Sequence, residues 1–142
     1  MLLLFALVLL TPSLAHAQKK SSSGLVTAAD IAKYPNDPLE RIIARMVSGV
    51  QVVRDDNGNN ILQIRGAITI PDRESGAQFI KHPLYVVDGM AVHTPDGTLP
   101  DLEPQDLDSV RVLKGAEATA FGIEGSDGVI VFTTRRGKLR SK

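Results

Sequence analysis

The segment from Pro83 to Lys138 limits most tightly what this chain can fold into. It contains apolar runs that predict strands at residues 84–87, 110–113 and 129–134. The first run is continuous rather than alternating, as is typical of a central strand covered on both faces. About fifteen residues separate the last two runs, which is long enough for a parallel crossover. The segment predicts a small mixed sheet that carries short helices.

An amphipathic run before this segment predicts a helix. Asp37 is placed to cap it, Pro38 suits its first position, and Glu40 stands three residues after the cap. Gly49 can adopt the left-handed conformation that ends a helix. One face of the predicted helix is apolar, and it carries Leu39, Ile42, Ile43, Met46 and Val47.

The next two segments, 50–54 and 61–65, predict a hairpin. Asn57-Gly58 in the connection suits a turn that needs positive φ. In the second strand Leu62 and Ile64 alternate with two polar residues, which predicts one buried and one solvated face. Residues 70–82 carry Pro, Asp, Ser and Gly without a period and predict a surface loop.

Short helical elements are predicted within the Pro83–Lys138 segment. Pro104 opens a helical turn that extends to Asp108, and residues 116–122 predict a short helix that Gly122 stops. No internal repeat is present in the sequence. We therefore expect a single domain of the α/β (α+β) class.

The N-terminus predicts export. An apolar run, Leu2 to Leu10, precedes a Thr-Pro break and the small-residue site Ala15-His16-Ala17. A bilayer-spanning helix needs about 20 apolar residues, so no membrane span is expected here. We expect residues 1–17 to be a signal peptide, 18–24 a flexible linker, 25–138 the folded domain and 139–142 a basic tail. The basic end, from Arg135 onwards, is interpreted as solvated rather than lipid-binding.

Composition excludes several functions. The chain has no cysteine, so thiolate metal sites, cysteine nucleophiles and disulfides are excluded. Lys plus Arg and Asp plus Glu both number 16, so no overall field attracts nucleic acid. No phosphate-binding loop or nucleophile elbow is present. We expect no nucleic-acid partner and no cofactor.

Two possible metal sites are disfavoured by the spacing of their residues. Asp55, Asn57 and Asn59 alternate as in a calcium loop, but glycine is absent from its sixth position and Gly66 replaces the required glutamate. A hairpin turn is the favoured interpretation. His82 and His93 lack a spaced ligand set, so neither a metal nor an acid-base site is expected.

The order of these blocks resembles the plug domain of TonB-dependent outer-membrane receptors, and most of all the SusC-like subgroup. The resemblance covers nearly all of the chain after the signal segment, and the blocks that carry it are VSGVQV at residues 47–52, LQIRG at 62–66, PLYVVDGM at 83–90, LDSVRVLKGAEATAFG at 107–122 and DGVIVFTTRRGK at 127–138. It implies a non-enzymatic transport component, exported to the periplasm or associated with the outer membrane.

The resemblance also implies candidate structural or interface residues. Charged groups such as Arg65 and Asp88 often pair with one another or with the barrel wall in this family, whereas the glycines end strands and helices. The full candidate set is Arg65, Gly66, Asp88, Gly89, Gly115, Glu117, Gly122 and Gly128. The partners implied are an outer-membrane β-barrel or a SusD-like surface lipoprotein.

The chain departs from the family pattern. A plugged transporter barrel needs about 22 strands, and the residues up to Lys142 do not supply them. No counterpart of the energy-coupling TonB box is found. We therefore expect a stand-alone plug domain that binds or docks in the uptake of glycans or siderophore-type nutrients. The alternatives are a plug fragment of a split or decayed receptor without independent activity, and a small periplasmic enzyme, for which no catalytic constellation is found.

Overall fold

The computed structural model describes residues 24–65 and 81–140. The predicted signal peptide, all but the last residue of the predicted linker, Gly66 and nearly all of the predicted surface loop lie outside these ranges. None of the helices in the described ranges has the length and apolar character needed to cross a membrane.

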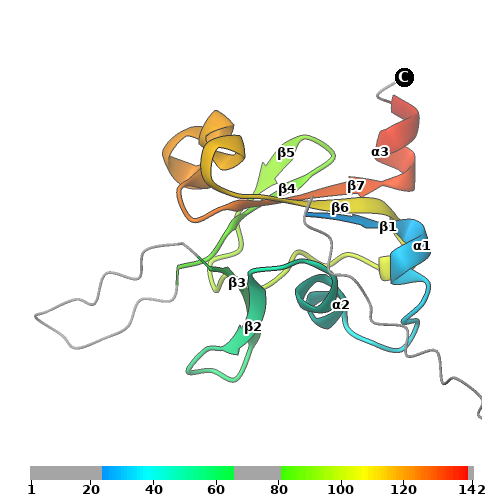
Figure 1. The fold of residues 1–142 in the computed structure, drawn as a ribbon, viewed down its shortest axis with the longest axis horizontal. Helices are drawn as coiled ribbons and strands as arrows, with labels where there is room; N and C mark the ends of the chain where they lie inside the picture. Colours follow the sequence, from blue (N-terminus) through cyan, green and yellow to red (C-terminus); the bar gives the residue numbers. More distant parts are fainter. Residues whose placement is uncertain (1–23, 66–80, 141–142) are drawn as a thin grey trace, which may run out of the picture.

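Within the described ranges, five strands form one mixed sheet in the order β1-β6-β7-β4-β5 (Figure 1). The parallel pair is β4 with β7, and the other pairs are antiparallel. The central position of β4 beside β7 agrees with its unbroken apolar sequence. The strands are β1 (Leu25–Thr27), β4 (Leu84–Val87), β5 (Met90–Val92), β6 (Leu107–Leu113) and β7 (Val129–Thr134).

One face of this sheet is sealed by a second layer. The layer consists of helix α2 (Leu39–Met46) and the hairpin of β2 (Val50–Arg54) and β3 (Asn60–Ile64), which lie below the sheet in Figure 1. The predicted apolar face of the helix is buried against the sheet. The core between the layers includes Ile42, Ile43, Leu62, Ile64, Tyr85, Val110, Val112, Ile130 and Phe132.

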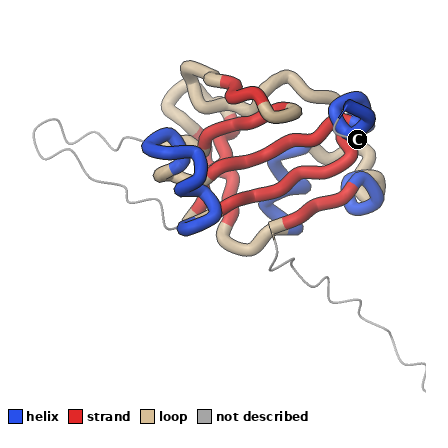
Figure 2. The backbone as a smooth tube through the Cα atoms, turned by 90° about the horizontal axis from the view of Figure 1, so that it is seen from above, coloured by secondary structure: helices blue, strands red, loops and turns tan. Residues whose placement is uncertain are grey.

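The opposite face of the sheet is covered only at its ends. The 3₁₀ segment η2 (Gly115–Gly125) covers one end, where Ala118 packs with Leu84 and Val129. Helix α3 (Arg135–Arg140) stands at the other end. Seen from above, the strands are open to view between these two elements (Figure 2).

Two short elements complete the described chain. Helix α1 (Ala28–Ile31) follows β1 directly and begins with a capping box between Thr27 and Asp30. The 3₁₀ turn η1 (Pro104–Asp106) precedes β6, in agreement with the helical turn predicted at this proline.

One topological expectation is wrong. The strands β6 and β7, which were expected to allow a parallel crossover, pair antiparallel, with Leu113 opposite Val129. The fifteen or so connecting residues fold into η2 over the end of the sheet, so the chain reverses instead of crossing back along the strand.

Details at the ends of two helices also differ from the sequence pattern. Pro38, rather than Asp37, is the N-cap of α2, and the Asp37 carboxylate lies 3.0 Å from Arg45. The helix ends at Met46 because Val47 adopts an extended conformation, two residues before Gly49. The basic segment after Thr134, expected to be a solvated tail, forms the helix α3, and most of its side chains are exposed.

Candidate functional site

The candidate interface residues that the structure describes do not form a single cluster. The Gly128 carbonyl accepts a hydrogen bond from the Leu84 amide at the start of β4, with a distance of 2.9 Å. Asp88 stands at the end of β4, where its amide bonds to the Phe132 carbonyl at 3.0 Å. The set is therefore divided between the two ends of β4, and Arg65 and Asp88 do not pair with each other.

The first group lies where the hairpin meets the ends of β6 and β7. The Arg65 amide donates to the Gly49 carbonyl at 2.7 Å, and its side chain is exposed. A Cβ placed on Gly49 would lie 3.2 Å from Lys114 Nζ and 4.0 Å from Arg65 Cβ. The Lys114 ammonium donates to the Ser48 carbonyl. Two cationic side chains therefore flank Gly49 at this end of the molecule.

Two candidate glycines belong to this same end. Gly115 follows Lys114 directly and opens η2. Gly128 precedes β7, and a Cβ there would lie 2.5 Å from Cδ1 of Ile64 and 3.3 Å from the Leu113 carbonyl oxygen. The absence of a side chain at residue 128 thus lets the hairpin approach the ends of β6 and β7 closely.

The second group forms a connection between the β4–β5 turn and α3. Asp88, with φ +49, and Gly89 make the turn. The Asp88 carboxylate accepts from the Thr134 amide at 2.8 Å and from the Thr134 hydroxyl at 2.7 Å. The same hydroxyl oxygen accepts from the Gly137 amide at 3.0 Å, so Thr134 caps α3. A Cβ on Gly137 would overlap the Asp88 carboxylate.

The remaining two candidates lie in η2. Glu117 is exposed, and its amide donates to the Lys114 carbonyl at 3.2 Å. Gly122 interrupts the segment with φ +67 and ψ −147, and one further turn follows before Gly125. The predicted stop at Gly122 is therefore confirmed, because this residue leaves the helical conformation and separates the first helical part from the second.

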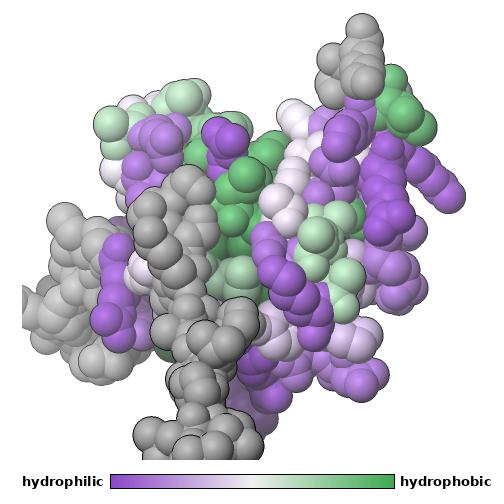
Figure 3. Space-filling view, turned by 45° about the vertical axis from the view of Figure 1, so that its right-hand side comes forward, coloured by the Kyte–Doolittle hydropathy of each residue, from purple (hydrophilic) through white to green (hydrophobic). Residues whose placement is uncertain are grey.

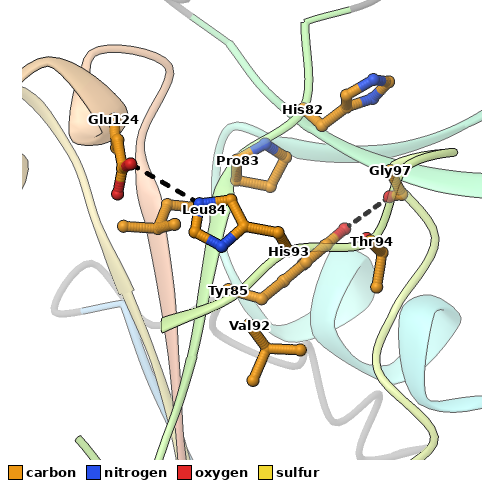
Figure 4. A pocket seen from close by; sticks show the side chains of 9 residues that line it. All are labelled: His82, Pro83, Leu84, Tyr85, Val92, His93, Thr94, Gly97 and Glu124. Carbon is orange, nitrogen blue, oxygen red and sulfur yellow. Dashed lines mark hydrogen bonds and ion pairs between the residues drawn. The ribbon is translucent and has the colours of Figure 1, made fainter. Parts of the chain in front are cut away.

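A cavity of about 290 Å³ contains both histidines that were tested as ligands or bases (Figure 4). His93 Nε2 lies 3.6 Å from the Glu124 carboxylate, and both side chains are mostly exposed. The imidazole of His82 lies instead beside Gly97 and away from Glu124. Within residues 24–65 and 81–140, no group of three His, Asp or Glu side chains could hold a metal ion.

At the bottom of this cavity, a buried hydrogen bond has a structural role. The Tyr85 hydroxyl donates to the Gly97 carbonyl at 2.9 Å, and burial raises the pKa of Tyr85. Since the hydroxyl is held protonated and hydrogen-bonded, it fixes the loop after β5 to the sheet. The cavity therefore presents neither an activated nucleophile nor a base that is oriented by a third group.

The calcium-like spacing around Asp55 forms a turn. The Asp55 carboxylate accepts from the Asn59 amide at 2.6 Å and from the Asn59 side chain at 3.0 Å. Gly58 has φ +84, as a tight hairpin turn requires. The favoured interpretation of this segment is confirmed.

Sequence reasoning missed residues in both groups. Lys114 is not among the predicted interface residues, although its position directly after a predicted strand, like that of Asp88, was a sequence signal for one. Thr134 and Gly137 were missed because the helix that they begin was not predicted. Their contacts join residues 46 positions apart in the sequence, which local patterns do not indicate.

Several known proteins are similar to this chain. Residues 16–129 match the model of the TonB-dependent receptor plug domain. The TonB-dependent receptor P39 of Formosa agariphila is 36% identical over 105 residues, which are 72% of this chain and 9% of that protein. The TonB-dependent receptor SusC of Bacteroides thetaiotaomicron is 29% identical over 87% of this chain and 13% of that protein.

Solved structures give the same result. The RagAB peptide importer in its open-open state superposes with a TM-score of 0.57 and 25% identity, over 83% of this chain and 13% of the importer chain. The present sequence therefore spans only a small part of the relatives that it matches. The plug model covers more than half of the sequence, and the fold agrees with it. The chain belongs to the TonB-dependent receptor plug domain family.

Proposed function

We propose that this domain is a non-enzymatic interaction module of outer-membrane nutrient uptake, and that it works by docking on a β-barrel. The observation that carries the proposal is the plug-family match over residues 16–129. Plug domains are components of transport, and the mixed-sheet fold is that of the plug in solved receptors. We place the protein after export in the periplasm or at the outer membrane.

The surface supports a domain that is covered by another molecule. A plug that acts alone is expected to have polar outer faces. Here the exposed large apolar side chains among the described residues include Ile123, Leu139 and Met90, with 92%, 78% and 67% of their surface accessible. These side chains belong to η2, α3 and β5 and add apolar area that a partner could bury.

The cationic end described above supplies a charged docking feature. Arg65 is exposed beside Lys114, whose ammonium donates to the Ser48 carbonyl. A carboxylate on the partner would be attracted to both side chains, and complementary charge fixes the orientation of docking. We assign Arg65 to this role, together with Lys114.

The proposal for the nutrient and the second partner is drawn by analogy with the relatives. The relatives include a SusC receptor and a peptide importer named RagAB. We infer uptake of a glycan or siderophore-type nutrient, in company with a SusD-like surface lipoprotein. Neither a cofactor nor a metal is part of this proposal.

Crosslinking at native expression level tests the proposal. The tagged protein is crosslinked in cells, membranes are fractionated, and attached proteins are identified by mass spectrometry. We expect an outer-membrane barrel, together with a SusD-like lipoprotein. A double variant, Arg65→Glu with Lys114→Glu, should reduce barrel capture, whereas Arg54→Glu at the distant hairpin tip should not. Recovery of only a soluble, unattached monomer would contradict the proposal.

The alternative is a plug fragment of a split or decayed receptor without independent activity. The limited coverage of the relatives, 9% of P39 and 13% of SusC, is the observation that keeps this alternative in view. Deletion of the gene distinguishes a working interaction module from an inactive fragment. Loss of growth on a nutrient that needs outer-membrane uptake supports a working module, and unchanged growth on every such nutrient supports a fragment without activity.

A further inference from the structure

The tip of the β2–β3 hairpin is polar and open to water. It consists of Asp55, Asp56, Asn57, Gly58 and Asn59, and it stands away from the five-stranded sheet and from α2 (Figure 1). The three central residues of the tip are exposed. The tip differs in this from the apolar surface that is visible in the hollow between η2 and α3 in Figure 3. Any chemistry at the tip therefore takes place in contact with water.

The side chain of Asn57 is open to attack from the main chain. Its amide has an electrophilic carbonyl carbon, and the nitrogen of the next residue is the nearest nucleophile. Gly58 has φ +84, and a Cβ placed on it would meet no atom within 4 Å. Neither a side chain nor a packed neighbour hinders the Gly58 nitrogen. The Gly58 amide donates to the Asp55 carbonyl at 3.0 Å, but a single turn bond at an exposed tip opens without disturbing the strands.

The three other asparagines of the chain are held or hindered. The Asn59 side chain donates to a carboxylate at 3.0 Å, and its main-chain amide donates to the same group at 2.6 Å. Asn60 precedes Ile61, which is branched at Cβ and only 1% exposed within the β2–β3 ladder. Asn36 precedes an aspartate whose amide is bonded to a carbonyl at 3.2 Å. Neighbouring structure thus disfavours the same attack at these residues.

The Asp-Gly pairs of the described chain, which have the same main-chain geometry available, are also restrained. Asp88 accepts two hydrogen bonds from Thr134, Asp96 accepts one from the Thr98 hydroxyl at 2.8 Å, and the carboxylate of Asp127 is ion-paired at 3.3 Å. An ionised carboxylate is in addition a poor electrophile. Within residues 24–65 and 81–140, the neutral Asn57 side chain has no hydrogen-bond partner that would hold it in the same way.

We propose that Asn57 is a site of spontaneous deamidation, with water as the only co-reactant. The Gly58 nitrogen loses its proton to solvent and bonds to the side-chain carbonyl carbon of Asn57. The side-chain nitrogen takes up a proton and leaves as ammonia, which closes a cyclic imide. Water then opens the imide at either carbonyl carbon and gives aspartate or isoaspartate, so that water is consumed, ammonia is released and nothing is oxidised or reduced. The inference is independent of the proposed function.

The reaction changes the hairpin tip in two ways. Either product adds a negative charge beside Asp55 and Asp56, and like charges so close together repel one another. Isoaspartate also routes the main chain through Cβ, so the turn becomes longer than the pairing of Arg54 with Asn60 requires. The tip therefore acquires a covalent mark that accumulates with the age of the molecule and loosens the end of the hairpin.

Peptide mapping of the purified full chain tests the proposal. Trypsin releases residues 34–41 and 55–65, so one digest follows Asn57 and the three control asparagines. The folded chain is incubated in mildly alkaline buffer made with heavy-oxygen water, and electron-transfer fragmentation distinguishes aspartate from isoaspartate. We expect conversion at Asn57, with isoaspartate present and heavy oxygen incorporated from water. The control asparagines should stay unchanged over the same period.

Two variants and one physical measurement complete the experiment. Gly58→Ala should lose most of the conversion because its methyl group hinders the attack, and Asn57→Gln should lose it while keeping a neutral amide at the tip. Circular dichroism must show that both are folded, and the second variant serves if positive φ prevents Gly58→Ala from folding. Hydrogen exchange near Arg54 and Asn60 should be faster in the aged parent chain than in the fresh chain, and unchanged by ageing in Asn57→Gln.

Three results would overturn the inference. Conversion in urea but not in the folded chain would show that the bond between Gly58 and Asp55 protects Asn57. Equal conversion at the control asparagines would show that the fold does not select this site. Unchanged hydrogen exchange in a converted parent chain would show that the mark does not loosen the hairpin.

Discussion

The two faces of the five-stranded sheet are built from the same strands but have different surroundings. Toward α2 and the hairpin, Val110, Ile130 and Phe132 are fully buried. Toward the opposite side, Arg111 and Val131, their neighbours along the same strands, remain exposed or half-buried. The difference teaches that α2 and the hairpin bury most of the core, whereas on the second face η2 buries only the end that carries Leu84, Val86 and Val129.

The largest expected effect is on the sealed face. Phe132→Ala removes a fully buried ring that contacts Tyr85, with the ring centroids 6.3 Å apart. We expect a loss of about 3–5 kcal/mol in the free energy of unfolding because a large cavity remains. Val131→Ala, one position away on the opposite face, should cost about 1 kcal/mol. Urea unfolding of the purified chain measures both, and equal losses would show that the two faces contribute alike.

The connection between the β4–β5 turn and α3 gives the next effect. Asp88→Ala leaves the Thr134 amide and hydroxyl without their acceptor, so we expect a loss of about 1–3 kcal/mol. Gly137→Ala should loosen the same contact because its Cβ would overlap the carboxylate. Hydrogen exchange of the Thr134 and Gly137 amides reports on the contact, with Asp101→Ala in an exposed loop as the control. Unchanged exchange in both variants would mean that α3 is held by other contacts.

A smaller effect is expected at the capping box after β1. Thr27→Ala removes the acceptor of the Asp30 amide and should cost about 1 kcal/mol. Ser at the same position should restore most of the stability because its hydroxyl can accept the same bond. Urea midpoints of the two variants check this, and an equal loss for Ser would point to the lost methyl group instead.

The capping box of Thr27 and Asp30 also predicts that stability depends on pH. The ion pair with Lys33 and the Thr27 hydroxyl lower the pKa of Asp30 below its ordinary value of 3.8. The contribution of the ionised Asp30 to the free energy of unfolding is therefore complete above pH 3.8. It is lost as the pH falls through the lower pKa of the folded state. The stability difference between the parent chain and Asp30→Asn should shrink from neutral pH to about pH 2. A difference that is constant over this range would contradict the assignment.

The smallest effect on folding is expected at Arg111. Its side chain is exposed, so Arg111→Glu should change the free energy of unfolding by no more than about 0.5 kcal/mol. Thermal unfolding of the purified chain measures this change. A large loss would mean that Arg111 holds the domain together, and the contrast between the sealed face and the opposite face would then fail at this residue.

Most strands and the main helix could be predicted because their signals are local. The run from Leu84 to Val87, the alternation at Leu62 and Ile64, and the apolar face of α2 correspond directly to burial. Strand β5 was missed because its three residues follow a two-residue turn and two of them are exposed. An edge strand of this kind has neither alternation nor length.

The elements that were missed depend on contacts distant in sequence. Helix α3 contains Gly137 and has no apolar period, and it begins where Asp88 and Thr134 meet, 46 residues apart. The antiparallel pairing of β6 with β7 follows from η2 folding over the sheet end, which the length of the connection alone does not fix. The approach of Lys114 and Arg65 to Gly49 likewise requires the two layers to be assembled.

The strand order has a consequence for when this domain can fold. The first strand, β1, pairs with β6, so Leu25 meets Arg111, and β4 finds its parallel partner only in β7. Pairings between segments so far apart in sequence make folding slow, because a long loop closes before the contacts that stabilise it form. A chain synthesised from its N-terminus therefore cannot complete the five-stranded sheet until residues near 134 are available.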